Sequence, residues 1–312
     1  MQKNISRRAF LGAMLGASAV VVAACTSSSN NTSAEGSSTT AGSTEPSSAD
    51  QTQRVVALNT GQLDNLLTLG ILPVGVAAAK NADLIPEFIR NRFGADFDLD
   101  SIVNCGLRAE PDVEVIASLN PTLICANSRT DETILEKLRA IAPLVTGAGG
   151  GENWKEDFTT IAAGVGKEAE AKTLLADYEQ RAAKIAADQP ATPPSVSFLR
   201  TNDDAAFQMY GLNSMTGTVA ADCGYARPEA QQFTDKAGHD LSAELLAQAD
   251  ADWIFYGVQA GSPSPVDTAL WPSLQAVQDQ RAIEINFDSW FVNASLLSAE
   301  IIMDGLRSTI KA

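Results

Sequence analysis

A helix-and-strand pattern occurs twice in this chain. The segment EVIASLNPTLICA at Glu114–Ala126 returns as ELLAQADADWIFY at Glu244–Tyr256, 130 positions later. Each copy begins with a glutamate, continues with apolar residues at helical spacing, passes a polar pair and ends in a run of strand-forming residues. We therefore predict an internally duplicated chain with two halves of one plan.

Short apolar runs alternate with helical patterns in both halves. In the first half the runs are RVVAL, VGVAAA, SIVNC and TLICA, with helical spacing at Leu63–Leu69 and Pro111–Leu119. In the second half they are SVSFL, DWIFY and IEINF, with helices expected near 214–222, at 242–249 and from about Ala294. Short strands separated by helices are typical of parallel sheets that are covered on both faces. The expected fold class is therefore α/β, with two Rossmann-like lobes.

One segment between the halves differs from the rest. From Glu168 to Asp188 the apolar residues recur in steps of three and four, and no Gly or Pro interrupts them. This pattern predicts one rigid helix about 31 Å long, enough to run across both lobes. We therefore expect an N-terminal lobe at 54–150, a connecting segment at 151–190 and a C-terminal lobe at 191–312. Such a helix would limit how far the lobes can open.

The first residues have the pattern of an export signal. Arg7 and Arg8 precede an apolar run that is shorter than the roughly 20 residues needed to span a bilayer. The run ends in VAAC, which resembles a bacterial lipobox with Cys25 as the acylated residue. Residues 1–24 are thus expected to be a twin-arginine-type lipoprotein signal, and residues 25–53, rich in Ser and Thr, a disordered tether. The body would then be lipid-anchored at the outer face of the cytoplasmic membrane.

The net charge and the cysteine spacing exclude some classes of partner and site. The formal net charge of −16 argues against nucleic acid as a partner. Cys105, Cys125 and Cys223 lack the CxxC spacing of a zinc or redox site. Cys105 and Cys125 could form a disulfide if their strands are neighbours, and three buried thiols are the alternative.

Candidate binding residues follow the predicted strands, because sheets of this type bind ligands beyond the carboxyl ends of their strands. In the first lobe they are Asn59, Thr60, Arg108, Asn127, Ser128 and Arg129, with Trp154 at the start of the connecting segment. In the second lobe they are Arg200, Thr201, Tyr210, Tyr225, Arg227, Tyr256, Trp290 and Phe291. Trp271, which precedes a proline, is assigned to packing.

The folded body resembles a known family from Arg54 to the C-terminus. The resemblance is carried by RVVALNTGQLDNLLTLGILPVGVAA, NCGLRAEPDVEVIASLNPTLICA, NWKEDFTTIAAGVGKEAEAKTLLADYEQR and LWPSLQAVQDQRAIEIN. These segments resemble the helical-backbone substrate-binding proteins of ABC importers, and among them the ferric-siderophore-binding lipoproteins. The resemblance implies a monomer with a ligand between its lobes, no resident cofactor, and a two-subunit permease as partner.

The repeated glutamates gain a role from this resemblance. In the family, one glutamate on each lobe is implied to meet an arginine pocket on each permease subunit, and the matching positions here are Glu114 and Glu244. The alternative is that each is an ordinary acid in the first turn of a helix, where the helix dipole favours negative charge.

A ferric siderophore accounts for the mixture of arginines and aromatic residues among the candidates. The siderophore already encloses the iron, so the protein can hold the outside of the complex with guanidinium groups and flat rings. Haem is an alternative, with Tyr210, Tyr225, Tyr256, Met209 or His239 as axial ligand. Cobalamin and a non-transport envelope role also stay open. The single histidine disfavours a direct metal site, and no hydrolase, phosphate-loop or metalloprotease motif indicates an enzyme.

Overall fold

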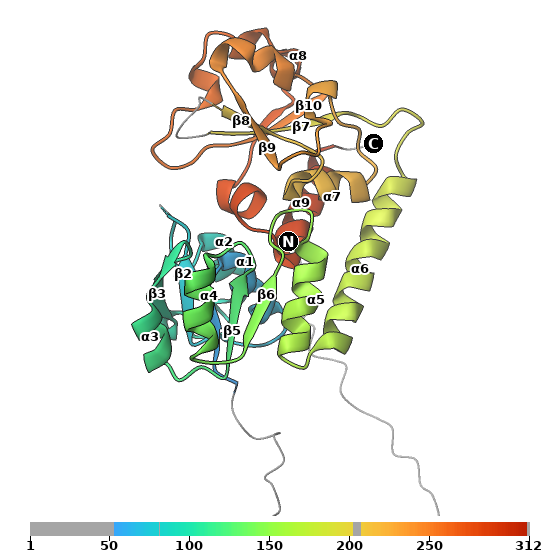
Figure 1. The fold of residues 1–312 in the computed structure, drawn as a ribbon. Helices are drawn as coiled ribbons and strands as arrows, with labels where there is room; N and C mark the ends of the chain where they lie inside the picture. Colours follow the sequence, from blue (N-terminus) through green and yellow to red (C-terminus); the bar gives the residue numbers. More distant parts are fainter. Residues whose placement is uncertain (1–52, 81, 202–206, 311–312) are drawn as a thin grey trace, which may run out of the picture. The chain divides into compact units, whose positions relative to one another are not determined.

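The computed structural model describes residues 53–80, 82–201 and 207–310 (Figure 1). The predicted signal, the Cys25 lipidation site and nearly all of the predicted tether lie outside the described residues. The side chain of Thr60 also lies outside them. In the part of the chain that is described, no helix has the length and apolar content needed to cross a bilayer.

The N-terminal lobe is built on a six-stranded sheet of order β4-β3-β2-β1-β5-β6. Its strands are β1 (Val55–Ala57), β2 (Gly75–Ala78), β3 (Val103–Leu107), β4 (Glu110–Pro111), β5 (Leu123–Asn127) and β6 (Leu144–Gly147). All neighbours are parallel except β3 and β4. Val55 and Ala57 face one apolar core while Val56 faces another, because side chains alternate along a strand. Both faces of this sheet are therefore covered, as predicted.

The C-terminal lobe has a five-stranded sheet of order β11-β10-β7-β8-β9. Its strands are β7 (Val196–Thr201), β8 (Phe207–Tyr210), β9 (Gly238–Leu241), β10 (Trp253–Gly257) and β11 (Ala282–Glu284). β7, β10 and β11 are parallel, but β8 runs antiparallel to both β7 and β9. This part of the sheet departs from the predicted parallel arrangement. The reason is the short link of residues 202–206, since a parallel crossover needs roughly a dozen residues or more.

The repeated sequence pattern occupies equivalent places in the two lobes. Helix α3 (Val113–Ser118) leads into β5, and the 3-10 helix η3 (Ala243–Ala249) leads into β10. The two helices begin 130 positions apart, and β5 and β10 begin and end 130 positions apart. Each strand pairs in parallel with the first strand of its own lobe, β1 or β7. The predicted duplication is confirmed in the topology of these segments.

The connecting segment contains two helices, α5 (Trp154–Gly164) and α6 (Glu168–Ala187). With 20 residues, α6 is about 30 Å long, and Figure 1 shows it passing from beside α5 toward the C-terminal lobe. The remaining α-helices are α1 (Thr60–Thr68), α2 (Glu87–Phe93), α4 (Glu132–Arg139), α7 (Met215–Asp222), α8 (Gln275–Gln278) and α9 (Leu296–Thr309). The predicted α/β fold of two lobes joined by a long helix is confirmed.

A single apolar core extends through both lobes. It includes Val55 of β1, Phe158 of α5, Tyr178 of α6, Phe198 of β7 and Ile302 of α9. The outer faces of the two sheets have separate, smaller cores. The lobes therefore share buried apolar surface as well as a connecting helix.

No disulfide joins Cys105 to Cys125; both are free and buried. Cys105 lies on β3 and Cys125 on β5, and the sheet order places β2 and β1 between them. Three strand spacings amount to about 14 Å, whereas bridged cysteines have Cα atoms about 4.4–6.8 Å apart. The disulfide alternative was therefore wrong, because strand order cannot be read from local sequence.

Candidate functional site

Three cavities share Arg108 in their lining: residues of both lobes line two of them, and residues of the N-terminal lobe line the third. Their volumes are about 860, 480 and 230 Å³. The largest and the smallest also share Tyr210 and Phe291, which come from the C-terminal lobe. We call these three cavities together the cleft. The largest of the three cavities alone suits a small-molecule ligand, since such pockets usually measure about 300–1,000 Å³.

The N-terminal wall of the cleft is formed where parallel strands end. Asn59 follows β1, Arg108 follows β3, and Asn127 closes β5 with Arg129 two residues later. Backbone hydrogen bonds hold these residues in place: the amide of Arg108 donates to the carbonyl of Ala78 over 2.8 Å. The predicted candidates Asn59, Arg108, Asn127 and Arg129 are thus brought together, and their binding roles stay predictions.

Arg200 is the main basic residue of the C-terminal wall. It lies near the carboxyl end of β7, and its guanidinium carbon is 5.4 Å from the ring centre of Tyr210 and 5.5 Å from that of Phe287. Its Nε is buried and has no hydrogen-bond partner among the described residues. Tyr210 in turn packs against Phe291 at 5.0 Å between ring centres. Aromatic faces therefore fix the position of a guanidinium whose hydrogen-bonding capacity is not used up.

Three arginines lie close enough in the cleft to influence one another. The pKa of Arg108 is lowered by burial first, and then by the like charges of Arg129 and Arg200. None of these three arginines makes an ion pair within the described part of the chain. An anionic ligand would reduce the electrostatic repulsion among these three guanidinium groups.

Acidic residues line the cleft as well: they are Asp83, Asp131, Asp157, Glu284 and Asp288. Asp288 and Asp83 line the largest cavity, and the pKa of Asp288 is raised by burial and then by the charge of Asp83. Asp157 lines the smallest cavity, where its carboxylate accepts the backbone amides of Ala148 and Gly149 at 2.7 and 2.9 Å. Cations and acids thus line the same cavities: Asp157 shares the smallest with Arg129, and Asp288 shares the largest with Arg200.

Polar contacts and close backbone packing join the lobes beside the smallest cavity of the cleft. The carboxyl group of Asp64 on α1 accepts from Asn293 Nδ2 at 3.0 Å and from Ser295 Oγ at 2.8 Å. A Cβ on Gly61 would lie 2.8 Å from the carbonyl oxygen of Ala294, and one on Gly151 would lie 2.0 Å from the amide nitrogen of Met215. Only glycine permits these approaches, so the contacts define a tight seam between the lobes.

Arg227, predicted to contact the ligand, is a core residue instead. Only 8% exposed, it donates to the carbonyls of Val196 and Tyr210 and to the side-chain oxygen of Gln231. Its guanidinium lies 4.5 Å from the ring centre of Phe198, and burial lowers its pKa to about 9. It lines none of the cleft cavities. Its position indicates a structural role.

Three other predicted aromatic residues also pack inside the lobes. Trp154 is 1% exposed and meets Tyr178 edge to face at 5.0 Å, while Trp290 stacks on Phe255 at 5.4 Å. Tyr256 packs against Trp271 in the outer core of the C-terminal lobe, which confirms the packing role given to Trp271. Trp154, Trp290 and Tyr256 therefore do not line the cleft.

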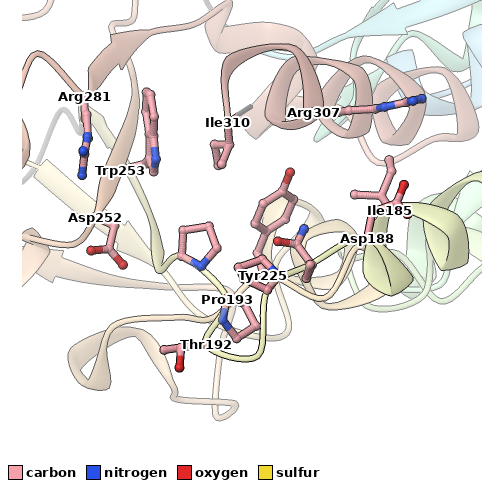
Figure 2. A pocket seen from close by; sticks show the side chains of 13 residues that line it. Ile185, Asp188, Thr192, Pro193, Tyr225, Asp252, Trp253, Arg281, Arg307 and Ile310 are labelled. Atoms are coloured by element: carbon pink, nitrogen blue, oxygen red, sulfur yellow. The ribbon is translucent and has the colours of Figure 1, made fainter. Parts of the chain in front are cut away.

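Tyr225 lies in a different cavity, which Figure 2 shows from close by. This cavity measures about 700 Å³, is lined by Ile185, Trp253, Arg281 and Arg307 among others, and shares no residue with the cleft. In Figure 2 Arg281 lies beside Trp253, and the Tyr225 ring lies below Ile310. The cavity adjoins the amino ends of β7 and β10, whereas the cleft adjoins carboxyl ends. We call it the second cavity.

Several cleft residues were not among the sequence candidates. Lys80 follows β2, Phe287 follows β11, and the glycine-rich loop 147–151 follows β6. The rule that ligands bind beyond the carboxyl ends of strands would have found all three if it had been applied to every strand. The predicted Ser128 and Thr201 do not line the cleft cavities.

The repeated glutamates occupy equivalent exposed positions. Glu114 lies in the first turn of α3 and Glu244 in the first turn of η3, and both side chains are exposed. Asp112 caps α3 by accepting the amides of Glu114 and Val115 at 3.1 and 3.0 Å. The two glutamates are therefore available to a partner on the surface.

The described residues contain no group of three or more His, Cys, Asp and Glu side chains arranged to hold a metal ion. His239, the chain's single histidine, is bonded to Asp235 and stacks on Phe233. Met209 lies in the outer core of the C-terminal lobe. Of the residues considered as haem ligands, Tyr210 alone lines the cleft among the described residues.

Comparison with known proteins gives consistent matches. A family model described as "Periplasmic binding protein" matches residues 55–288. The probable siderophore-binding lipoprotein YfiY of Bacillus subtilis is 29% identical, over 82% of this chain and 82% of its own. The Fe(3+)-citrate-binding protein YfmC of the same organism is 30% identical, over 80% and 78%. The structure of Staphylococcus aureus SirA complexed with staphyloferrin B matches with a TM-score of 0.71 at 24% identity, over 82% and 92%.

Proposed function

Because this chain belongs to the periplasmic binding protein family, we propose that it is the solute-binding protein of an ABC importer and that it carries a ferric siderophore in its cleft. The observation that carries the proposal is the group of three arginines in the cleft, Arg108, Arg129 and Arg200, which make no ion pair with any described residue. A guanidinium offers a planar fork of donors to the oxygens on the outside of such a complex. The names of the relatives, which include siderophore and ferric citrate binding, support the same ligand class.

Ligand binding can be tested by thermal shift on the body from Gln53 onward. At 100 times its dissociation constant, a ligand adds about 2.7 kcal/mol to the free energy of unfolding. For a protein of this size, the true ligand should raise the Tm by about 5–10 °C. The screen includes iron-loaded hydroxamates, catecholates and hydroxycarboxylates, together with haem and cobalamin. A shift with haem or cobalamin and with no ferric siderophore would refute the proposed ligand.

Delivery to a permease is proposed to depend on Glu114 and Glu244. Their exposure on equivalent helices of the two lobes suits a receptor made of two similar subunits. The double variant Glu114→Ala/Glu244→Ala should keep its ligand affinity and lose iron uptake by cells. The matched control is Glu136→Ala/Glu229→Ala, which removes two other exposed glutamates, one from each lobe. Equal uptake by the two double variants would refute the docking role.

We also propose that the body is held at the outer face of the cytoplasmic membrane through a lipid on Cys25. The export signal and the lipobox-like VAAC support this proposal. Cys25→Ala should release the protein from the membrane fraction. Membrane retention of that variant would refute lipid anchoring.

A further inference from the structure

We propose that Asp64 is a positioning residue for the ligand site. From the N-terminal lobe it holds residues 293–295 of the C-terminal lobe, and through them the adjoining turn, whose side chains line the cleft. This inference rests on the proposed function and adds to it a residue that itself lines none of the cleft cavities.

One short segment of the C-terminal lobe faces both the cleft and the other lobe. It joins β11 to α9 and contains a π-helical turn, η6 (Asp288–Val292). Such turns are rare and are found frequently at functional sites. The residues of this segment that line the largest or the smallest cavity are Phe287, Asp288, Phe291, Val292, Asn293 and Ala294. A ligand in the cleft would therefore lie within a few residues of the contacts between the lobes.

Two adjacent side chains of α1 hold the end of this segment. Asn293 Nδ2 and Ser295 Oγ donate to Oδ2 of Asp64 at 3.0 and 2.8 Å. The amide of Leu296 donates to the side-chain oxygen of Asn65 at 3.2 Å. Asp64 and Asn65 are both buried, so loss of either acceptor would leave buried donors unsatisfied. The N-terminal lobe thus fixes the backbone that leads from η6 into α9.

Rings of the C-terminal lobe hold η6 from the other side. Phe291 packs against Tyr210 at 5.0 Å between ring centres, and Trp290 stacks on Phe255 at 5.4 Å. Protein interiors are close-packed and leave little room for a side chain to shift alone. A displacement of residues 293–295 should therefore also displace Phe291, which lines two cavities of the cleft.

No charged group stabilises the ionised form of Asp64. Burial raises its pKa to about 8, and α1 has no other charged residue. The charged residues of η6 and of the helices α5 and α9, which pack against α1, do not contribute to this shift; they are Lys155, Glu156, Asp157, Asp288, Glu300, Asp304 and Arg307. Above about pH 8 Asp64 becomes a buried charge without a counter-ion, which favours states in which the seam opens and water reaches it.

The first experiment measures ligand affinity at pH 7. Ferric citrate, ferric staphyloferrin B and ferric bacillibactin are titrated against the purified protein by fluorescence, and the complex that binds most tightly serves as the probe. Asp64→Leu is similar in size and has no acceptor. It should weaken binding about tenfold, because the turn then occupies its binding position for only part of the time. Asp64→Asn keeps an acceptor oxygen and should stay within about twofold of the parent.

Leu138→Ala is the control for a general loss of stability. Leu138 is buried in the outer core of the N-terminal lobe, on α4, so its truncation destabilises the protein without touching the seam. Its affinity for the probe should stay within about twofold of the parent. Equal losses of affinity in Asp64→Leu and Leu138→Ala would show that binding follows stability alone and would overturn the inference. Circular dichroism checks that each variant folds.

Hydrogen exchange of the ligand-free protein gives a second test, which needs neither a probe nor the leucine variant. Rates at the amides of Asn293 and Leu296 are corrected for the intrinsic effect of pH. Between pH 6 and pH 9 the corrected rates should rise roughly 100-fold in the parent, because the open seam lets Asp64 lose its proton and the closed seam retains it up to about pH 8. Asp64→Asn should show no such rise. The same pH profile in both proteins would overturn the inference.

The outcomes separate the inference from the proposed function. If none of the three iron complexes binds, the proposed function fails, and the exchange profile alone decides whether Asp64 positions residues 293–295. If a complex binds and Asp64→Leu keeps the parent's affinity, the proposed function stands and the positioning role fails.

Discussion

Asp64 is a carboxyl group in an unusual setting. It is fully buried at the seam between the lobes, and its Oδ1 has no hydrogen-bond partner among the described residues. Burial raises its pKa from 3.8 to about 8, although hydrogen bonds from Ser295, Asn293 and the backbone of Asn65 lower it in part. No charged group contributes to the shift. At neutral pH the folded protein therefore keeps a proton that the unfolded chain has lost.

The raised pKa of Asp64 predicts how the stability of the protein depends on pH. Between about pH 4 and pH 8 the folded state binds more protons at Asp64 than the unfolded state, so the free energy of unfolding falls as pH rises. The fall is at most about 1.4 kcal/mol per pH unit and levels off above the folded pKa. Asp64→Asn should reduce this slope, as measured by urea unfolding at pH 5 and pH 8. The exposed Asp177→Asn is the control and should keep the parent's slope. Equal slopes in all three proteins would contradict the prediction.

Arg200 and Arg227 show how the same residue type can serve two purposes. Arg200 lies near the carboxyl end of β7, while Arg227 donates to Val196, Tyr210 and Gln231; each keeps one buried nitrogen without a partner among the described residues, Nε in Arg200 and Nη1 in Arg227. Their sequence neighbourhoods did not distinguish them, and both were predicted to contact ligand. The difference lies in position: Arg200 lines the cleft, whereas Arg227 lines none of its cavities and donates inside the C-terminal lobe.

At the scale of elements, α6 is fixed to its surroundings along its length. Tyr178 donates to Asp222 of α7 over 2.9 Å. Arg181 pairs with Glu300 at 2.7 Å and with Asp304 at 2.8 Å, both on α9. The helix is thus both a connector and a packing surface, and its straightness should matter for stability.

A break in α6 provides the test. Ala176 is exposed near the middle of the helix, so its side chain can be changed without disturbing the core. Ala176→Pro removes a helical hydrogen bond and should cost about 3 kcal/mol or more, whereas Ala176→Gly should cost about 1 kcal/mol. Urea unfolding of the two variants measures the difference. If the proline variant were as stable as the glycine variant, the stability of the protein would not depend on a continuous α6.

For the whole molecule, the shared core predicts cooperative unfolding. Apolar residues of β1, α5, α6, β7 and α9 belong to one cluster, so neither lobe can unfold without exposing the buried surface of the other. Calorimetry of the body from Gln53 onward should show one transition, with the calorimetric enthalpy equal to the van't Hoff enthalpy. Two separated transitions would show that the lobes are independent.

The same shared core bears on ligand entry. The seam at Gly61, Gly151 and Asp64 brings the backbones of the two lobes into contact beside the smallest cavity of the cleft. Large separation of the lobes would break these contacts and expose the core. We therefore expect small adjustments at the cleft on ligand binding, in agreement with the limited opening predicted from α6.

The sequence alone determined the parts of this protein that depend on local periodicity. Apolar spacing defined α6 and most strands, and the repeated pattern located α3 with β5 and η3 with β10. Strand ends also identified Asn59, Arg108 and Arg200 as cleft residues, because the carboxyl ends of parallel strands converge on one edge.

Only the tertiary structure decided features that depend on which segments become neighbours. Strand order kept Cys105 away from Cys125, and a short link turned β8 antiparallel to β7. Packing buried Trp154 and Trp290 inside the lobes and left Tyr210 on the cleft. In a sheet that is covered on both faces, the strands are apolar on both sides. The local sequence pattern therefore does not show which side chains will face the ligand, because contacts between distant segments decide that.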